Sequence, residues 1–202
     1  MFSHNLAVGL TKRGFDVLVI CPSQTGKNYT QVVDGVETVY LRSVQAKVYP
    51  DQIHPLPKQK KMIGVKLPTL LYRHGFRVSV FPQYEIKKTL DRFRPDIVHV
   101  QVSDPIGLSV VSYARKHHIP VVTTEHNQPE VLTSSFKIPE LMKKPFNALL
   151  YSYFRNRQSK SDFVTMPTKQ AIDNLLREYE MKVPVAAISN GVDLTSFRPG
   201  KV

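Results

Sequence analysis

One stretch of the chain decides the fold: residues 94–126, which read RPDIVHVQVSDPIGLSVVSYARKHHIPVVTTEH. Its apolar runs over 96–100 and 119–124 have the length and the β-branched content of strands. Between them, residues 106–117 repeat apolar side chains at helical spacing. The side chains predicted to face inward from this helix are Leu108, Val111 and Ala114. A strand, a helix and a strand in this order predict a βαβ unit with parallel strands and a right-handed crossover.

The same alternation continues on both sides of this unit. Before it, the predicted elements are a helix over 2–10, strands over 16–21 and 36–41, and a helix that begins at 83 and ends before Pro95. After it, they are a helix over 149–160, a strand over 162–166, a helix capped by Thr168 and a strand over 185–188. The predicted class is therefore α/β, an open parallel sheet with helices on both faces.

The composition excludes several classes of protein. Hydrophobic residues make up 42% of the 202 residues, which suits a chain that folds around a core. The single cysteine, Cys21, rules out an intramolecular disulfide and a cysteine-rich metal site. No uncharged apolar run approaches the roughly 18 residues of a spanning helix, and the N-terminus lacks a signal-peptide pattern. We therefore expect a cytoplasmic protein without a metal site.

The positive charge is concentrated in one segment. Residues 42–94 hold 12 of the 28 basic and three of the 16 acidic side chains, which places nine of the twelve excess charges there. Prolines interrupt any regular pattern over 43–82, which we interpret as a basic irregular excursion. Its mixed basic and apolar composition suits an anionic membrane, an anionic substrate or nucleic acid, although a solvated loop over packed apolar residues is equally open. The residues predicted to contact a membrane or another anion are Lys58, Lys60, Lys61, Lys66, Arg73 and Arg77.

Ligands of open parallel sheets bind beyond the carboxyl ends of the strands, so polar residues there are the first candidates for a site. His126 follows the strand 119–124, with Glu125 and Asn127 beside it. An imidazole there can hydrogen-bond to a sugar hydroxyl or a phosphate, and a neighbouring carboxylate would tune it. From position alone, a functional and a structural role are equally open. His99, inside a strand, is instead predicted to be a hydrogen-bonded core residue.

Nucleotide-binding motifs with a glycine signature are absent. Gly26-Lys27 has no glycine five residues before it and is followed by Asn28, so it is not a P-loop, and no G-x-G-x-x-G occurs. The segment 189–193, SNGVD, turns the chain after the last strand. Gly191 there permits a positive φ or the close approach of a ligand, and Asn190 suits a tight turn.

Five fragments, taken together and in order, resemble one family. They are HNLAVGLTKRGFDV at 4–17, RPDIVHVQ at 94–101, PIG at 105–107, IPVVTTEH at 119–126 and SNGVDLTSFRP at 189–199. This series resembles the N-terminal half of a family 4 glycosyltransferase, a retaining enzyme with the GT-B fold. The resemblance extends over the chain except the basic excursion. It implies one Rossmann-like domain over residues 1–202, with the interdomain linker starting at 190.

The resemblance also implies an activity. The N-terminal domain of such enzymes binds mainly the acceptor, and the C-terminal domain binds the nucleotide sugar. A hexosyl group would then pass from a UDP- or GDP-hexose to a lipid or saccharide acceptor, without a metal or other cofactor. His126 corresponds to the family's active-site histidine, beside the donor sugar. The residues that the resemblance places along the substrates are Asp104, Gly107, Glu125, Asn127, Asn190 and Gly191.

Two parts of the family pattern lie outside this chain: the first strand with its glycine-rich loop, and the donor domain with its E-x7-E pair. We therefore expect a fragment that does not transfer sugar alone, whether a truncated reading frame, a split gene or a separate domain. Its expected place is the cytoplasm, with peripheral contact to the inner face of the cell membrane. The alternative function is a non-enzymatic basic α/β module that binds a polyanion, and an inactive degenerate fragment is a third hypothesis. Nucleic acid is not expected as a partner, because no RNA-binding motif accompanies the aromatic residues.

Overall fold

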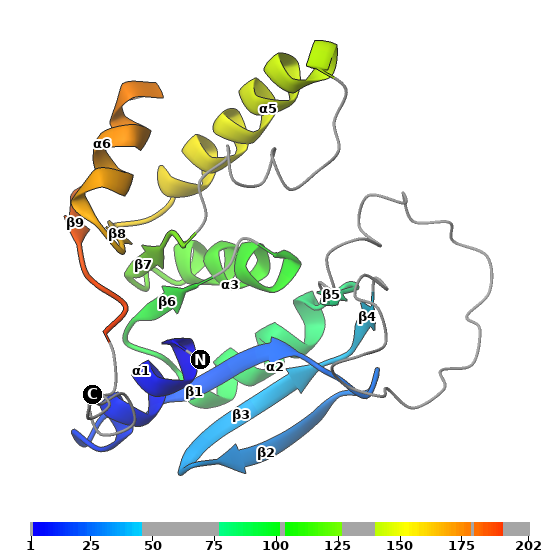
Figure 1. The fold of residues 1–202 in the computed structure, drawn as a ribbon. Helices are drawn as coiled ribbons and strands as arrows, with labels where there is room; N and C mark the ends of the chain where they lie inside the picture. Colours follow the sequence, from blue (N-terminus) through cyan, green and yellow to red (C-terminus); the bar gives the residue numbers. More distant parts are fainter. Residues whose placement is uncertain (1, 46–76, 102–103, 127–139, 179, 192–202) are drawn as a thin grey trace, which may run out of the picture.

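The computed structural model describes residues 2–45, 77–101, 104–126, 140–178 and 180–191 (Figure 1). Its N-terminal elements are α1 (Phe2–Thr11), β1 (Leu18–Pro22), β2 (Tyr29–Val33), β3 (Val36–Leu41), β4 (Ser43–Gln45), β5 (Arg77–Ser79) and α2 (Gln83–Phe93). Its C-terminal elements are β6 (Val98–Val100), α3 (Pro105–Lys116), β7 (Val121–Thr124), α5 (Glu140–Gln158), β8 (Phe163–Met166), α6 (Lys169–Glu178) and β9 (Val185–Ala187). The predicted α/β class is confirmed.

The C-terminal strands form the parallel sheet that residues 94–126 predict. Its order is β6-β7-β8-β9, and every neighbouring pair is parallel. Thr168 caps α6 as predicted, because its hydroxyl accepts a hydrogen bond from Ala171 N at 3.1 Å. Since the strands follow one another in chain order, right-handed crossovers return every connecting helix to the same side of this sheet.

The buried side of this sheet can be traced through the register. Val100, Thr123 and Val164 lie opposite one another across β6, β7 and β8, and all three are buried. Val100 belongs to the cluster packed by α3, and Val164 belongs to the cluster packed by α6 and by Tyr151 of α5. The second side of the sheet therefore carries the alternate residues of the strands.

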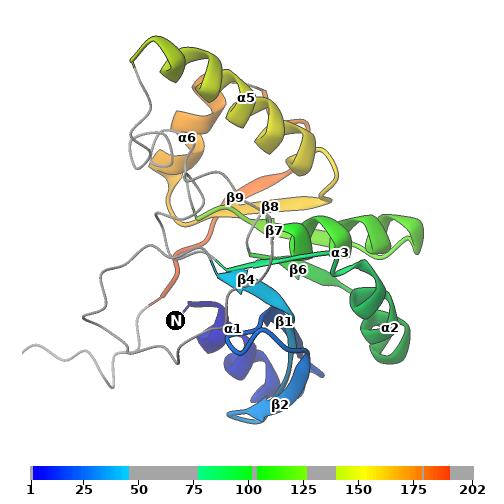
Figure 2. The same ribbon diagram turned by 90° about the vertical axis from the view of Figure 1, so that its right-hand side faces the viewer.

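The N-terminal strands form a mixed sheet of order β1-β3-β2, in which β1 is parallel and β2 antiparallel to β3. The sequence pattern does not predict β2. Asp34 and Gly35, with φ of 49° and 82°, join β2 to β3 in a tight hairpin. Helices lie on both sides of this sheet, with α1 on one side and α2 on the other (Figures 1 and 2).

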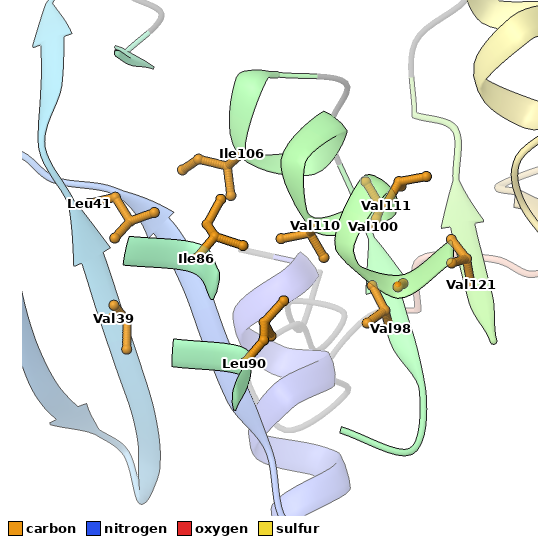
Figure 3. Packing of buried hydrophobic residues seen from close by; sticks show 11 residues of the cluster. Val39, Leu41, Ile86, Leu90, Val98, Val100, Ile106, Val110, Val111 and Val121 are labelled. Carbon is orange, nitrogen blue, oxygen red and sulfur yellow. The ribbon is translucent and has the colours of Figure 1, made fainter. Parts of the chain in front are cut away.

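One apolar core holds the two sheets together. Val39 and Leu41 of β3, Ile86 and Leu90 of α2, and residues of α3 and β6 pack into a single buried cluster (Figure 3). Leu18 and Ile20 of β1 pack against the same cluster. Within the described residues, no ladder of hydrogen bonds connects β1 to β6. Side-chain packing on α2 and α3 therefore joins the two sheets.

The two ends of the predicted irregular excursion are regular. Ser43–Gln45 and Arg77–Ser79 pair antiparallel as β4 and β5, so the segment leaves and returns through a short two-stranded ribbon. The prediction of irregular structure over 43–82 is wrong at these ends, because three-residue strands are too short to show an alternating pattern. Residues 46–76 of the excursion lie outside the described residues.

Two further predictions about helices need correction. Leu108 is 43% exposed, because α3 turns Ile106 and Val110 toward the core instead. Helix α5 begins at Glu140 rather than near 149 and includes Pro145. In the part of the chain that the structure describes, no helix has both the length and the apolar character needed to cross a membrane.

Candidate functional site

The end of β7 sends two neighbouring residues to opposite sides of the sheet. Glu125 N donates to Thr165 O at 2.9 Å, so the ladder continues one residue beyond the strand. Because side chains alternate along an extended chain, Glu125 follows Thr123 toward the helices. His126 follows Thr124 toward the second side.

On this second side, five polar side chains from three strands form a hydrogen-bonded line. His126 Nε2 lies 2.8 Å from Gln101 Oε1, and Gln101 Nε2 lies 3.0 Å from His99 Nε2 and 3.3 Å from His99 Nδ1. His99 Nε2 lies 2.6 Å from Thr124 Oγ1, which lies 2.6 Å from Thr165 Oγ1. We call these five residues the polar line. It connects β8, β7 and β6 to the imidazole of His126 at the carboxyl ends of the strands.

The polar line runs from the interior to solvent. Thr124 and Thr165 are buried, His126 is half-buried, and His99 is exposed. His99 is therefore hydrogen-bonded as predicted but is not a core residue, because it lies on the less covered side of the sheet. Its ring nitrogens nevertheless turn toward Thr124 and Gln101. Poor solvation of these nitrogens, together with the charge of His126, lowers the pKa of His99.

Burial also lowers the pKa of His126 below the usual histidine value of 6.5. A neutral imidazole donates from one ring nitrogen and accepts at the other, so both histidines can take part in directed hydrogen bonds near neutral pH. This arrangement can bind a hydroxyl or phosphate group, or exchange a proton with it.

Glu125 lies in a different environment from the one expected of a substrate-binding residue. Its carboxylate forms an ion pair with Arg157 of α5, and both side chains are almost completely buried. Gln158 Nε2 donates to the same carboxylate at 3.5 Å. The alternation along β7 thus directs Glu125 into the fold, away from His126, and we assign it a structural role.

Asp104 and Gly107 also serve the fold. Asp104 is the N-cap of α3, and its Oδ1 accepts a hydrogen bond from Gly107 N at 2.8 Å. Gly107 is buried in the first turn. Burial raises the pKa of Asp104, although the hydrogen bonds of the cap act against this rise. The charge of Asp104 also helps to raise the pKa values of Cys21 and Tyr153, so these groups gather near the start of α3.

Asn190 and Gly191 follow β9 and are exposed. Gly191 has a φ of 68°, and no atom lies within 4 Å of a β-carbon built on it. The positive φ predicted for this glycine is therefore present, and the close approach of a ligand stays a prediction. Asn127 lies outside the described residues, as do the predicted anion contacts Lys58, Lys60, Lys61, Lys66 and Arg73.

Arg77 is the predicted anion contact that lies among the described residues. It belongs to β5, is half-buried, and donates from Nη1 to Ser23 O at 2.7 Å. The same nitrogen lies 3.4 Å from Ser43 Oγ of β4. The guanidinium therefore connects the end of β1 to the β4-β5 ribbon, and its contact with an anion stays a prediction.

Two other regions offer less support for a site. Among the described residues, no group of three histidine, cysteine, aspartate or glutamate side chains could hold a metal ion. A shallow hollow of about 510 Å³ lies on the outer surface between α2 and α3, lined by residues such as Lys87, Ser112 and Lys116. It is separate from the carboxyl ends of the strands, so the polar line remains the candidate site.

Gln101, Thr124 and Thr165 were not among the predicted site residues. A signal for the first two was present, because Gln101 stands two residues after His99 and Thr124 stands two residues before His126. Residues two apart on a strand share one side of a sheet. Thr165 could not be found in this way, since its place beside Thr124 depends on the pairing of β7 with β8.

An open parallel sheet with polar side chains at its carboxyl ends places this chain in the α/β class, whose members bind ligands at this edge of the sheet. The family model of Glycosyltransferase Family 4 matches residues 1–196, and the chain belongs to this family. Among solved structures, a UDP-N-acetylglucosamine 2-epimerase is similar at 22% identity, with a TM-score of 0.34. That similarity covers 52% of this chain and 26% of the epimerase chain. No curated protein matches the chain.

Proposed function

We propose that this chain is the acceptor-binding half of a retaining glycosyltransferase. In the proposed reaction a hexosyl group moves from a nucleotide sugar, such as a UDP- or GDP-hexose, to a hydroxyl group of a lipid or saccharide acceptor, and the nucleoside diphosphate leaves. Membership of Glycosyltransferase Family 4 supports the reaction class. The observation that carries the site is the half-buried imidazole of His126, held by Gln101 at the carboxyl ends of the parallel strands.

His126 suits this role because it can hydrogen-bond to a sugar without carrying a permanent charge. Its lowered pKa keeps it neutral near pH 7. A neutral ring can donate to, or accept from, a sugar hydroxyl as the glycosidic bond to the diphosphate breaks. A second domain would hold the donor in line with the acceptor, since transfer requires both substrates in register. We therefore propose that residues 1–202 alone bind acceptor and do not complete the transfer.

The proposal is tested by titrating the 202-residue chain with saccharide acceptors and with UDP- and GDP-hexoses, and by assaying transfer. We expect acceptor binding that weakens in His126→Ala, whereas the matched variant His118→Ala, altered at an exposed histidine, binds as before. Transfer should be absent without a donor domain. Full transfer by the chain alone, or acceptor binding that His126→Ala leaves unchanged, would contradict the proposal.

We further propose that the protein contacts the inner face of an anionic membrane from the cytoplasm through the first half of α5. This half projects beyond the strands (Figure 1). Leu141 is 89% exposed and Leu149 is 66% exposed, and Pro145 between them is also exposed. Residues four apart lie on one side of a helix, so these three form an apolar stripe. Lys143 and Lys144 lie beside it.

Lys143 forms an ion pair with Glu140, and Lys144 leaves this surface with a net positive charge, which favours anionic lipid as the occupant. A lysine near an anionic bilayer contributes about 1 kcal/mol of binding, and burying a leucine side chain contributes about 1.5–3 kcal/mol. Sedimentation with vesicles that contain anionic phospholipid tests this contact. The double variant Leu141→Glu and Leu149→Glu should remain in the supernatant. The control variant Val32→Glu, at an exposed position of β2, should sediment like the parent chain.

The basic excursion provides a second arm of this experiment. The triple variant with Lys58, Lys60 and Lys61 replaced by glutamate should lose vesicle binding at low salt if the excursion shares the contact. Loss in the triple variant alone would move the contact from α5 to the excursion. Binding that survives both sets of substitutions would remove the membrane from the proposed function.

A further inference from the structure

The polar line joins two imidazoles through one carboxamide. The Gln101 oxygen lies 2.8 Å from His126 Nε2, and the Gln101 nitrogen lies 3.0 to 3.3 Å from the ring nitrogens of His99. A carboxamide accepts at its oxygen and donates at its nitrogen. The two histidines therefore face opposite ends of the same amide. The ring at the amide oxygen must donate a hydrogen bond, and the ring at the amide nitrogen must accept one.

One directed set of hydrogen bonds fits these contacts. His126 Nε2–H donates to Gln101 Oε1, and Gln101 Nε2–H donates to His99 Nε2, the nearer of the two ring nitrogens. The Thr124 hydroxyl donates to the same Nε2 and accepts from the Thr165 hydroxyl. In this arrangement His99 must be neutral, because Nε2 accepts. His126 donates to Gln101 whether it is neutral or protonated.

Protonation of His99 would require the opposite arrangement. A protonated ring only donates, so the amide would have to turn its oxygen toward His99 and its nitrogen toward His126. His126 would then have to accept at Nε2 and be neutral. If both rings were protonated, one hydrogen bond would be lost and two positive charges would face each other. The carboxylate of Glu125, next to His126 in the chain, pairs with Arg157 on the helix side.

We propose that Gln101 and His99 are positioning residues for His126, and that the amide of Gln101 disfavours a positive charge on both imidazoles at once. The buried hydroxyls of Thr124 and Thr165 anchor the far end of the line. Gln101 therefore fixes both the orientation of the His126 ring and the order in which the rings take up protons, His126 first. This inference gains its functional meaning from the role proposed above for His126, but its test requires no sugar.

Ring ¹⁵N and ¹H NMR titrations of the 202-residue chain, from pH 4.5 to 8.5, test the proposal. In Gln101→Leu the two pKa values should move in opposite directions. His126 loses an acceptor that favours its charged form, so its pKa falls; His99 loses a donor that favours its neutral form, so its pKa rises. Each shift should be about 0.5 to 1 unit, which is the equivalent of one net hydrogen bond.

Gln101→Glu makes the contrasting case. A carboxylate accepts from both rings and attracts both charges, so both pKa values should rise, by about 1 to 3 units. His126→Gln removes the neighbouring charge, and the pKa of His99 should then rise alone. The matched control, Gln31→Leu, makes the same change at an exposed position of β2 and should move neither histidine.

The result that overturns the proposal is a folded Gln101→Leu chain, verified by circular dichroism, in which both pKa values stay in place or move together. If this variant does not fold, Gln101→Glu and His126→Gln carry the test, and an unchanged His99 in both refutes the coupling. Failure of the proposed function is recognised separately. In that case His126→Ala leaves acceptor binding intact while the opposite shifts of Gln101→Leu still occur.

Discussion

The buried pair of Glu125 and Arg157 gives the sharpest prediction about stability. Only 5% of the Glu125 side chain and 2% of the Arg157 side chain are exposed, and the guanidinium lies 5.5 Å from the ring centroid of Phe154. Glu125→Gln keeps the size of the side chain and removes its charge, so the Arg157 charge stays buried without its carboxylate. Breaking a buried pair in this way costs about 3–5 kcal/mol. For a domain of this size, that loss lowers Tm by about 6–20 °C.

Arg157→Met removes the cation of the pair instead of the carboxylate, and its effect on stability depends on pH. The Glu125 carboxylate then remains buried without a cation, which raises its pKa in the folded state above its unfolded value. The folded state consequently binds more protons than the unfolded state over the interval between the two pKa values. The stability of this variant should therefore increase as the pH falls through that interval, whereas protonation of Glu125 should not stabilise the parent chain over the same interval.

Urea unfolding monitored by circular dichroism measures both effects. The matched control is Glu37→Gln, because Glu37 pairs with Arg92 across the surface, where the two side chains are 32% and 57% exposed. It should change the free energy of unfolding little, because water screens an exposed ion pair. The double variant Glu125→Gln with Arg157→Met leaves neither charge buried and should recover much of the lost stability. A Glu125→Gln chain as stable as Glu37→Gln would refute the reasoning.

Three further predictions concern other groups. Burial raises the pKa of the Cys21 thiol to about 11, so at pH 8 its thiolate fraction is about one in a thousand. Alkylation of the native chain by iodoacetamide, followed by mass spectrometry, should therefore be slow and should become fast in denaturant. Asp104→Ala removes the cap of α3 and should cost about 1 kcal/mol in urea unfolding, whereas Asp104→Ser should restore most of it. A hydrogen bond from Val121 N and the charge of Arg115 lower the pKa of Asp162 below 3.8. The contribution of Asp162 to the free energy of unfolding is therefore complete above pH 3.8 and is lost as the pH falls through the folded-state pKa. Acid titration of Asp162→Asn should lack this loss.

The parallel sheet could be predicted because its strands are short, apolar and separated by amphipathic helices. Each of β6 to β9 coincides with a run of β-branched or small apolar residues, and β3 was predicted with its observed bounds. The pattern fails for β2, whose exposed side chains at Thr30, Gln31 and Val32 show no alternation. Its place in the sheet depends on the hairpin turn at Asp34, which pairs it with the predicted strand β3.

The candidate site could be located from the sequence but not assembled. The rule that ligands meet the carboxyl ends of strands led to His126, and this residue does lie at that edge. Which neighbours it has depends on the register between strands, and this register brings Gln101 to the imidazole while Glu125 turns away. Proximity along the chain was therefore a poor guide to proximity in space at this strand end.

At the end of β7, Glu125 points into the fold and His126 points to the other side of the sheet, and this affects which residues can be substituted independently. Substitution at the first position is limited by packing in the interior, and substitution at the second is limited by contact with a ligand. A lineage, or an engineer, can therefore vary every second residue along this edge to select a new ligand, and the packing beneath the strand need not be rebuilt each time.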